Sequence, residues 1–211
     1  MFKLSKRLSV CADLVHADSR LADVGCDHGY VPVSLIQTGK IKSAIACDIH
    51  EKPLLSCKNL VSKMNYSDKI KCVLSNGLEN IESCDVDDIL IAGMGGELIA
   101  DILQKCDFAK EKHLILNPMT HAEIARKWLY DNGFDIIHDI LVRDGSHFYC
   151  VFDAEYTGCV SSKSQADYFL GNVKDFTDKE YFEHLLNYLR NKERGGADYS
   201  EVICAIEDKI R

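Results

Sequence analysis

The sequence lacks an apolar run of the roughly 18–20 residues that a membrane-spanning helix needs. Its first twenty residues are amphipathic, without the apolar core or cleavage site of a secretory signal, so we expect a cytoplasmic protein with no membrane contact. No C-x-x-C pair occurs, and the closest two of the ten cysteines lie nine positions apart. This spacing excludes a zinc-ribbon or thiol-redox motif and predicts buried, reduced cysteines.

Several chemical signatures are also missing. The chain has no G-x-G-x-x-G diphosphate cradle, no G-x-S-x-G nucleophile motif, and no His/Asp/Glu group with metal-ligand spacing, so we expect no metal. Basic residues are outnumbered, with 25 Lys and Arg against 33 Asp and Glu, for a net charge of −8. A uniformly basic surface for nucleic acid is therefore excluded, and any such partner must be held by local patches.

The sequence does contain a regular alternation of strands and helices. Short apolar runs typical of strands covered on both faces occur at 21–24, 43–48, 69–74, 88–92 and 113–116. Between them, residues 32–36, 51–64, 97–105 and 121–131 carry apolar side chains at helical spacing. This alternation predicts an α/β fold with a mostly parallel, doubly wound sheet.

The end of this α/β region changes character. Two strand-like runs, 134–142 and 147–152, flank an Asp-Gly turn, which is a hairpin signal. A parallel sheet closed by an antiparallel hairpin is the Rossmann-like arrangement of class I S-adenosylmethionine methyltransferases. After residue 155 two apolar helical stripes predict a coiled-coil-like helical hairpin. We therefore expect two domains, at 1–153 and 154–211.

The most informative segment follows the first predicted strand. Asp23, Gly25 and Asp27 occupy a turn that leads into a helix, where open α/β sheets bind nucleotide-like ligands. Gly25 allows a ligand close to the backbone, and the two carboxylates favour a ligand with a positive amino group over a diphosphate. An ordinary strand–helix turn is an equally good interpretation of this segment alone.

Three further segments end predicted strands at the same edge of the sheet. Asp48 is placed to accept hydrogen bonds from ribose hydroxyls, although it could instead cap the following helix. Asn76, before Gly77, could bind an adenine edge or form a plain Asn-Gly turn. The run at 93–96 holds three glycines in four residues, which indicates a backbone that makes room for a ligand.

These segments together resemble the bacterial tRNA (adenine(22)-N1)-methyltransferase family. The resemblance is carried by D-x-G-x-D-H-x-Y-x-P at 23–32, A-C-D at 46–48, N-G-L at 76–78, A-G-M-G-G at 92–96 and R-x-W-L at 126–129. It covers about residues 4–153, and more loosely the rest of the chain. It implies transfer of a methyl group from S-adenosylmethionine to N1 of adenine 22 in tRNA, with a C-terminal helical domain that grips the tRNA.

The resemblance and the motif positions give a set of candidate residues. We expect the cofactor to be bound by nine of them: Asp23, Gly25, Cys26, Asp48, Ile49, Asn76, Gly77, Gly93 and Met94. Asp27, His28 and Tyr30 are the candidate catalytic residues. The candidate RNA contacts are Lys6, Arg7, Arg126 and Arg190.

The roles of the catalytic candidates follow from the nucleophile. Adenine N1 already has a lone pair, so alignment matters more than a general base. Asp27 would then supply a negative wall, His28 would orient the base and Tyr30 would hold it. We expect tRNA as the partner, no protein partner and a monomer. Two alternatives stay open: a methyltransferase for another RNA or a small molecule, and a non-catalytic binding module with the same fold.

Overall fold

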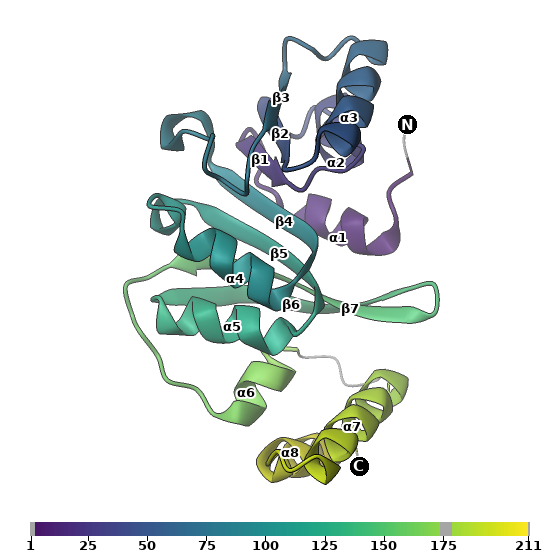
Figure 1. Cartoon of the computed structure of the whole chain (residues 1–211), viewed down its shortest axis with the longest axis vertical. Coiled ribbons are helices and arrows are strands. Elements are labelled where there is room, and N and C mark those ends of the chain that lie inside the picture. The colour runs from purple at the N-terminus through teal and green to yellow at the C-terminus, as the bar shows by residue number, and fades with distance from the viewer. Residues whose placement is uncertain (1–2, 174–178, 211) are drawn as a thin grey trace.

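The structure is a computed structural model that describes residues 3–173 and 179–210 of the chain (Figure 1). Its centre is a seven-stranded sheet with strand order β3-β2-β1-β4-β5-β7-β6. The strands are β1 (Arg20–Val24), β2 (Ser43–Asp48), β3 (Ile70–Leu74), β4 (Asp88–Gly95), β5 (His113–Thr120), β6 (Phe134–Asp144) and β7 (His147–Tyr156). The first five strands are parallel, and β7 joins β5 and β6 antiparallel, which confirms the predicted fold class.

Helices cover both faces of this sheet, which explains its continuous apolar strands. The first three helices, α1 (Lys6–Leu14), α2 (Tyr30–Gln37) and α3 (Glu51–Lys63), share one apolar core with one face of the strands. The helices α4 (Gly96–Gln104) and α5 (Ala122–Asp131) share a second core with the other face. Short 3-10 turns, η1 (Ser83–Asp85) and η2 (Ala109–Glu111), precede β4 and β5. No helix in the described ranges is long and apolar enough to cross a bilayer.

The C-terminal part is helical, as predicted. It contains α6 (Gln165–Leu170), α7 (Lys179–Arg194) and α8 (Ser200–Ile210). The last two pack side by side at the opposite end of the molecule from β3 (Figure 1). Phe182, Leu186 and Leu189 of α7 meet Val202 and Ile206 of α8 in a third, separate apolar core. Residues 195–199 connect these two helices.

The structure corrects three details of the sequence prediction. The strand predicted at 113–116 is longer than expected: β5 continues to Thr120, because the end of β4 also extends and pairs with it through two irregularities. Helix α2 begins at Tyr30, so Pro32 lies within its first turn rather than at its start. The cysteines are not uniformly buried, since Cys84, Cys159 and Cys204 are exposed.

Candidate functional site

The turn after β1 has an unusual backbone. Gly25 and Gly29 have φ values of 72° and 71°, and Asp27 between them has φ 49°. A non-glycine residue rarely adopts this left-handed conformation, so the turn maintains local strain to direct Asp27. At Gly25 a Cβ would lie 2.3 Å from Cε of Met94, so a side chain there would displace the flexible end of that methionine. The glycine turn predicted from the sequence is therefore a tight bend.

This turn forms one wall of a cavity of about 280 Å³, which we call the Asp23 cavity. Its lining includes Arg7, Asp23, Gly25, Cys26, Asp27, His28, Tyr30 and Gly93. Asp23 is buried, and burial together with the charge of Asp48 raises its pKa to about 7. Burial makes the Asp23 carboxylate costly to ionise, and a positively charged ligand beside it would lower that cost.

The three candidate catalytic residues line this cavity from its exposed side. Nε2 of His28 lies 3.6 Å from Oδ1 of Asp27, and the His28 and Tyr30 rings have centroids 5.4 Å apart. The Asp27 side chain is 71% exposed and that of His28 is 48% exposed, so both are open to an incoming substrate. The structure thus brings together all three residues that the sequence singled out.

Arg7 closes the same cavity from α1. Its Nη1 donates to Oδ1 of Asn117 at 2.9 Å, and its guanidinium lies over the Tyr149 ring at 5.6 Å. Asn117 is completely buried and donates through Nδ2 to the carbonyl of Cys150 at 2.9 Å. These contacts hold the Arg7 guanidinium in the cavity that Asp23 and Asp27 also line. They engage both polar atoms of the Asn117 side-chain amide.

A second cavity of about 300 Å³, the Asp48 cavity, lies at the ends of β2, β3 and β4. Its lining includes Asp48, Ile49, Asn76, Gly77, Gly93, Met94 and Leu98. Oδ1 of Asp48 accepts a hydrogen bond from the backbone N–H of His50 at 2.9 Å, which orients the carboxylate. Nδ2 of Asn76 donates to the Glu79 carboxylate at 2.7 Å. The carbonyl oxygen of the Asn76 side chain and the nearby backbone groups are therefore the ones suited to hydrogen-bond the edge of a base.

The two cavities share Gly25, Ala92 and Gly93 and are therefore neighbours on one edge of the sheet. Gly93 has φ 87°, and a Cβ there would meet nothing within 4 Å, so its open side faces space rather than protein. Gly96 serves packing instead, since a Cβ would lie 1.9 Å from the carbonyl oxygen of His121. An elongated ligand with a cationic end and a nucleoside end fits this pair of cavities.

Comparison with known proteins places this arrangement in a family. The profile described as "Methyltransferase domain" matches residues 4–152. The chain belongs to the methyltransferase-domain family. It is 38% identical over 155 residues to the tRNA (adenine(22)-N(1))-methyltransferase of Bacillus subtilis, an alignment that covers 72% of this chain and 65% of that protein. The aligned part thus spans just under two thirds of the length of that relative.

The similarity to solved structures extends over the whole chain. The B. subtilis m1A22 tRNA methyltransferase TrmK superposes with a TM-score of 0.84 at 30% identity, covering 100% of this chain and 97% of that one. Streptococcus pneumoniae Sp1610 in complex with S-adenosyl-L-methionine gives 0.89 at 32% identity, with coverage of 99% and 100%. TrmK of M. capricolum, in complex with S-adenosyl-homocysteine, gives 0.81 at 27% identity, covering 99% of this chain and 95% of that one.

The structure contradicts one of the predicted RNA contacts. The Arg126 side chain is only 1% exposed, and it binds the Asp139 carboxylate through Nε and Nη2 at 2.8 and 2.9 Å. Its Nη1 donates to the carbonyls of Tyr168 and Phe169, which attaches α6 to the sheet. Arg126 is therefore a structural residue that no phosphate can reach.

The remaining basic candidates have different settings. Lys6 is exposed at the start of α1; it precedes Arg7 in the sequence but does not line the Asp23 cavity. Arg190 on α7 forms an ion pair with Glu207 on α8 at 2.6 Å, and its side chain is 50% exposed. Arg190 is thus partly neutralised by its own hairpin, whereas Lys6 is exposed one residue before a residue of the cavity wall.

Sequence reasoning missed a third cavity, the aromatic cavity, with a volume of about 260 Å³. It lies between the end of β5, strand β7 and helix α7. Its lining includes Met119, His121, Phe148, Phe169, Tyr181, Leu185 and Tyr188. These residues come from segments up to 70 positions apart, so no local motif could reveal it; the aromatic residues at helical spacing on α7 were the available signal.

Proposed function

We propose that the protein transfers a methyl group from S-adenosylmethionine to N1 of adenine 22 in tRNA. The observation that carries this proposal is the pair of adjoining cavities, one built on Asp23 and the other on Asp48, in a chain whose relatives include a tRNA (adenine(22)-N(1))-methyltransferase. The first cavity offers carboxylates for an ammonium group, and the second offers a carboxylate and backbone groups for a nucleoside.

The residues fit the proposed cofactor. Asp23 binds the ammonium group, and Arg7, fixed beside it by Asn117, binds the carboxylate of the same amino acid end. Asp48 accepts from the ribose hydroxyls, with Ile49 against the sugar and base. The other proposed contacts come from Gly25, Cys26, Asn76, Gly77, Gly93 and Met94. When bound, S-adenosylmethionine supplies an electrophilic methyl group.

The catalytic residues act on the adenine. Its N1 attacks with an existing lone pair, so the protein mainly has to hold the base in line with the methyl group. The product carries a positive charge on the base, which the exposed carboxylate of Asp27 stabilises. Tyr30 stacks on the base and His28 orients it. Asp27→Ala should lower turnover at least tenfold and leave cofactor affinity within twofold; normal turnover would remove Asp27 from the mechanism.

Recognition of tRNA rests on shape and a few cations, in keeping with the net charge of −8. Lys6 and Arg190 contact phosphates, and the aromatic cavity offers stacking surfaces for an unpaired base. The region from residue 154 onward, including α7 and α8, forms the tRNA-gripping domain of a monomeric cytoplasmic enzyme. Because N1 lies on the Watson–Crick edge, adenine 22 has to be exposed before it reacts.

The decisive experiment incubates the protein with S-adenosylmethionine and unmodified tRNA, followed by mass spectrometry of the nucleosides. We expect 1-methyladenosine, absent from a matched tRNA in which adenine 22 is replaced by guanine. Methylation of another nucleoside, or of small molecules only, would favour the alternative methyltransferases. Cofactor binding without methyl transfer to any RNA would indicate a non-catalytic module.

A further inference from the structure

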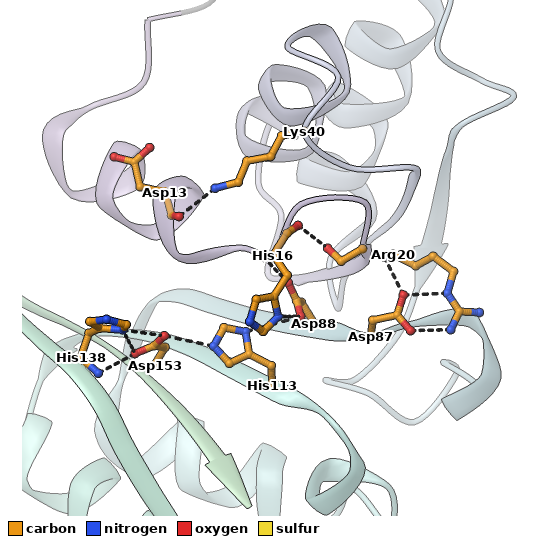
Figure 2. A network of polar contacts seen from close by, with 10 residues as sticks. Asp13, His16, Arg20, Lys40, Asp87, Asp88, His113, His138 and Asp153 are labelled. Atoms are coloured by element: carbon orange, nitrogen blue, oxygen red, sulfur yellow. Dashed lines mark hydrogen bonds and ion pairs between the residues drawn. The ribbon is translucent and has the colours of Figure 1, made fainter.

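Figure 2 shows a polar cluster at the amino ends of β4 and β5. The cofactor cavities lie at the other side of the sheet, where the parallel strands end. Asp88 and His113 are the first residues of β4 and β5 and pair with each other across the sheet. His16 reaches them from the segment between α1 and β1. The three residues are separated by 72 and 25 positions in the sequence, which is why no metal-ligand spacing is visible there.

The ligand atoms of these three residues converge. All lie within 4.8 Å of one another. Nδ1 of His16 is 3.0 Å from Oδ1 of Asp88, and Nδ1 of His113 is 3.4 Å from the same oxygen. Zinc binds nitrogen and oxygen at about 2.0–2.2 Å in a tetrahedron, so neighbouring ligand atoms lie about 3.3 Å apart. The two observed separations are close to that value.

One atom of the cluster is buried without a hydrogen bond. The His113 side chain is 5% exposed, and its Nδ1 has no hydrogen-bond partner among the described residues. Its Nε2 lies 3.1 Å from Oδ2 of Asp153, an acceptor that favours a proton on Nε2. The lone pair of Nδ1 then points toward the Asp88 carboxylate. The two facing lone pairs repel each other, and a proton or a metal ion between them relieves that repulsion.

The surrounding contacts are those of a prepared metal site. Asp153, which orients His113, is itself held by the backbone N–H and the ring of His138 at 2.7 and 3.0 Å. Oδ2 of Asp88 accepts from the backbone N–H of His16 at 2.7 Å, which leaves Oδ1 directed at both rings. A carboxylate that holds the second nitrogen of a ligating histidine is typical of zinc sites.

We propose that His16, Asp88 and His113 bind a zinc ion. Two imidazoles and one carboxylate form a zinc donor set, and the half-exposed side of His16 leaves the fourth position to water. The ion connects the segment after α1 to the amino ends of β4 and β5. Because α1 carries Arg7, the zinc stabilises the helix that closes the Asp23 cavity, without taking part in methyl transfer.

Cobalt substitution tests the site in the full-length protein. After treatment with a chelator, titration with Co²⁺ should give one equivalent of tetrahedral d–d absorption that Zn²⁺ displaces. The band of cobalt–thiolate charge transfer should be absent, because the exposed cysteines are not ligands. His16→Gln changes a side chain that is 55% exposed, so the protein should fold, and the metal dissociation constant should rise at least about tenfold.

Two further variants complete the test. His147→Gln, an exposed histidine on the β6–β7 turn, should bind the metal like the unchanged protein. Asp153→Asn should weaken binding about 10- to 100-fold while keeping the tetrahedral spectrum, as expected of a positioning residue. Absence of a tetrahedral spectrum, a thiolate band, or unchanged affinity in His16→Gln would overturn the proposal. None of these readouts depends on methyltransferase activity.

Discussion

Cofactor affinity should depend on pH through Asp23. Burial and the carboxylate of Asp48 raise the pKa of Asp23 from 3.8 to about 7 in the cofactor-free protein. Asp23 must be ionised to pair with the cofactor ammonium group, so binding becomes stronger as the pH rises through 7. The free energy of unfolding changes in the opposite direction. Below pH 4 the neutral carboxyl of Asp23 stabilises the folded chain, and this contribution of about 4 kcal/mol is lost as the pH rises through 7.

The magnitude of the binding effect follows from the ionised fraction. With a pKa of about 7, about a tenth of Asp23 is ionised at pH 6.0 and about three quarters at pH 7.5. The dissociation constant should therefore fall about eightfold over this interval, which corresponds to about 1 kcal/mol.

Isothermal titration calorimetry with S-adenosylhomocysteine at constant ionic strength measures this dependence directly. Asp23→Asn should bind weakly and show no pH dependence between 6.0 and 7.5. His28→Gln is the matched control, because His28 lines the same cavity but is not among the proposed cofactor contacts. The reasoning is refuted if the unchanged protein has a flat profile, or if the dependence survives in Asp23→Asn and disappears in His28→Gln.

Three substitutions test the packing and charge around the site. Arg126→Ala leaves Asp139 buried without its partner, so urea denaturation should show a loss of about 3–5 kcal/mol; unchanged stability would contradict the buried pair. Gly96→Ala forces a Cβ against the His121 carbonyl, so the folded state should be destabilised by about 1–3 kcal/mol in thermal melts. A normal melting temperature would refute this close approach. Arg7→Ala should raise the cofactor dissociation constant about tenfold without changing the salt dependence of tRNA binding. The reverse pattern would show that Arg7 binds phosphate.

The strands and helices of the sheet were predictable because their patterns are local. Continuous apolar runs at 88–92 and 113–116 mark strands covered on both faces, and both strands are present. Their ends were not predictable, because β4 and β5 lengthen each other by pairing beyond Ala92. The position of the cofactor cavities followed from topology, since parallel strands that run side by side end at one edge.

Arg126 shows where local reasoning about charge fails. A basic residue on a helix is usually exposed, so the sequence made Arg126 a candidate RNA contact. In the structure its helical neighbours Ala125, Leu129 and Tyr130 are all buried, and Arg126 lies with them at the inner face of α5. What the sequence could not supply was the partner: Asp139 lies 13 residues away on β6, and only the tertiary fold brings the two charges together.

The proposed zinc ligands show the same limit at the other edge of the sheet. Parallel pairing of two neighbouring strands places Asp88 beside His113, because both are first residues of their strands. The topology therefore accounts for two of the three ligands. His16 joins them only because the chain between α1 and β1 passes over the start of β4, a path that has no periodic pattern. A site that depends on such a loop can be found only in three dimensions, whereas the glycine turn after β1 is visible in the sequence because its chemistry is contiguous.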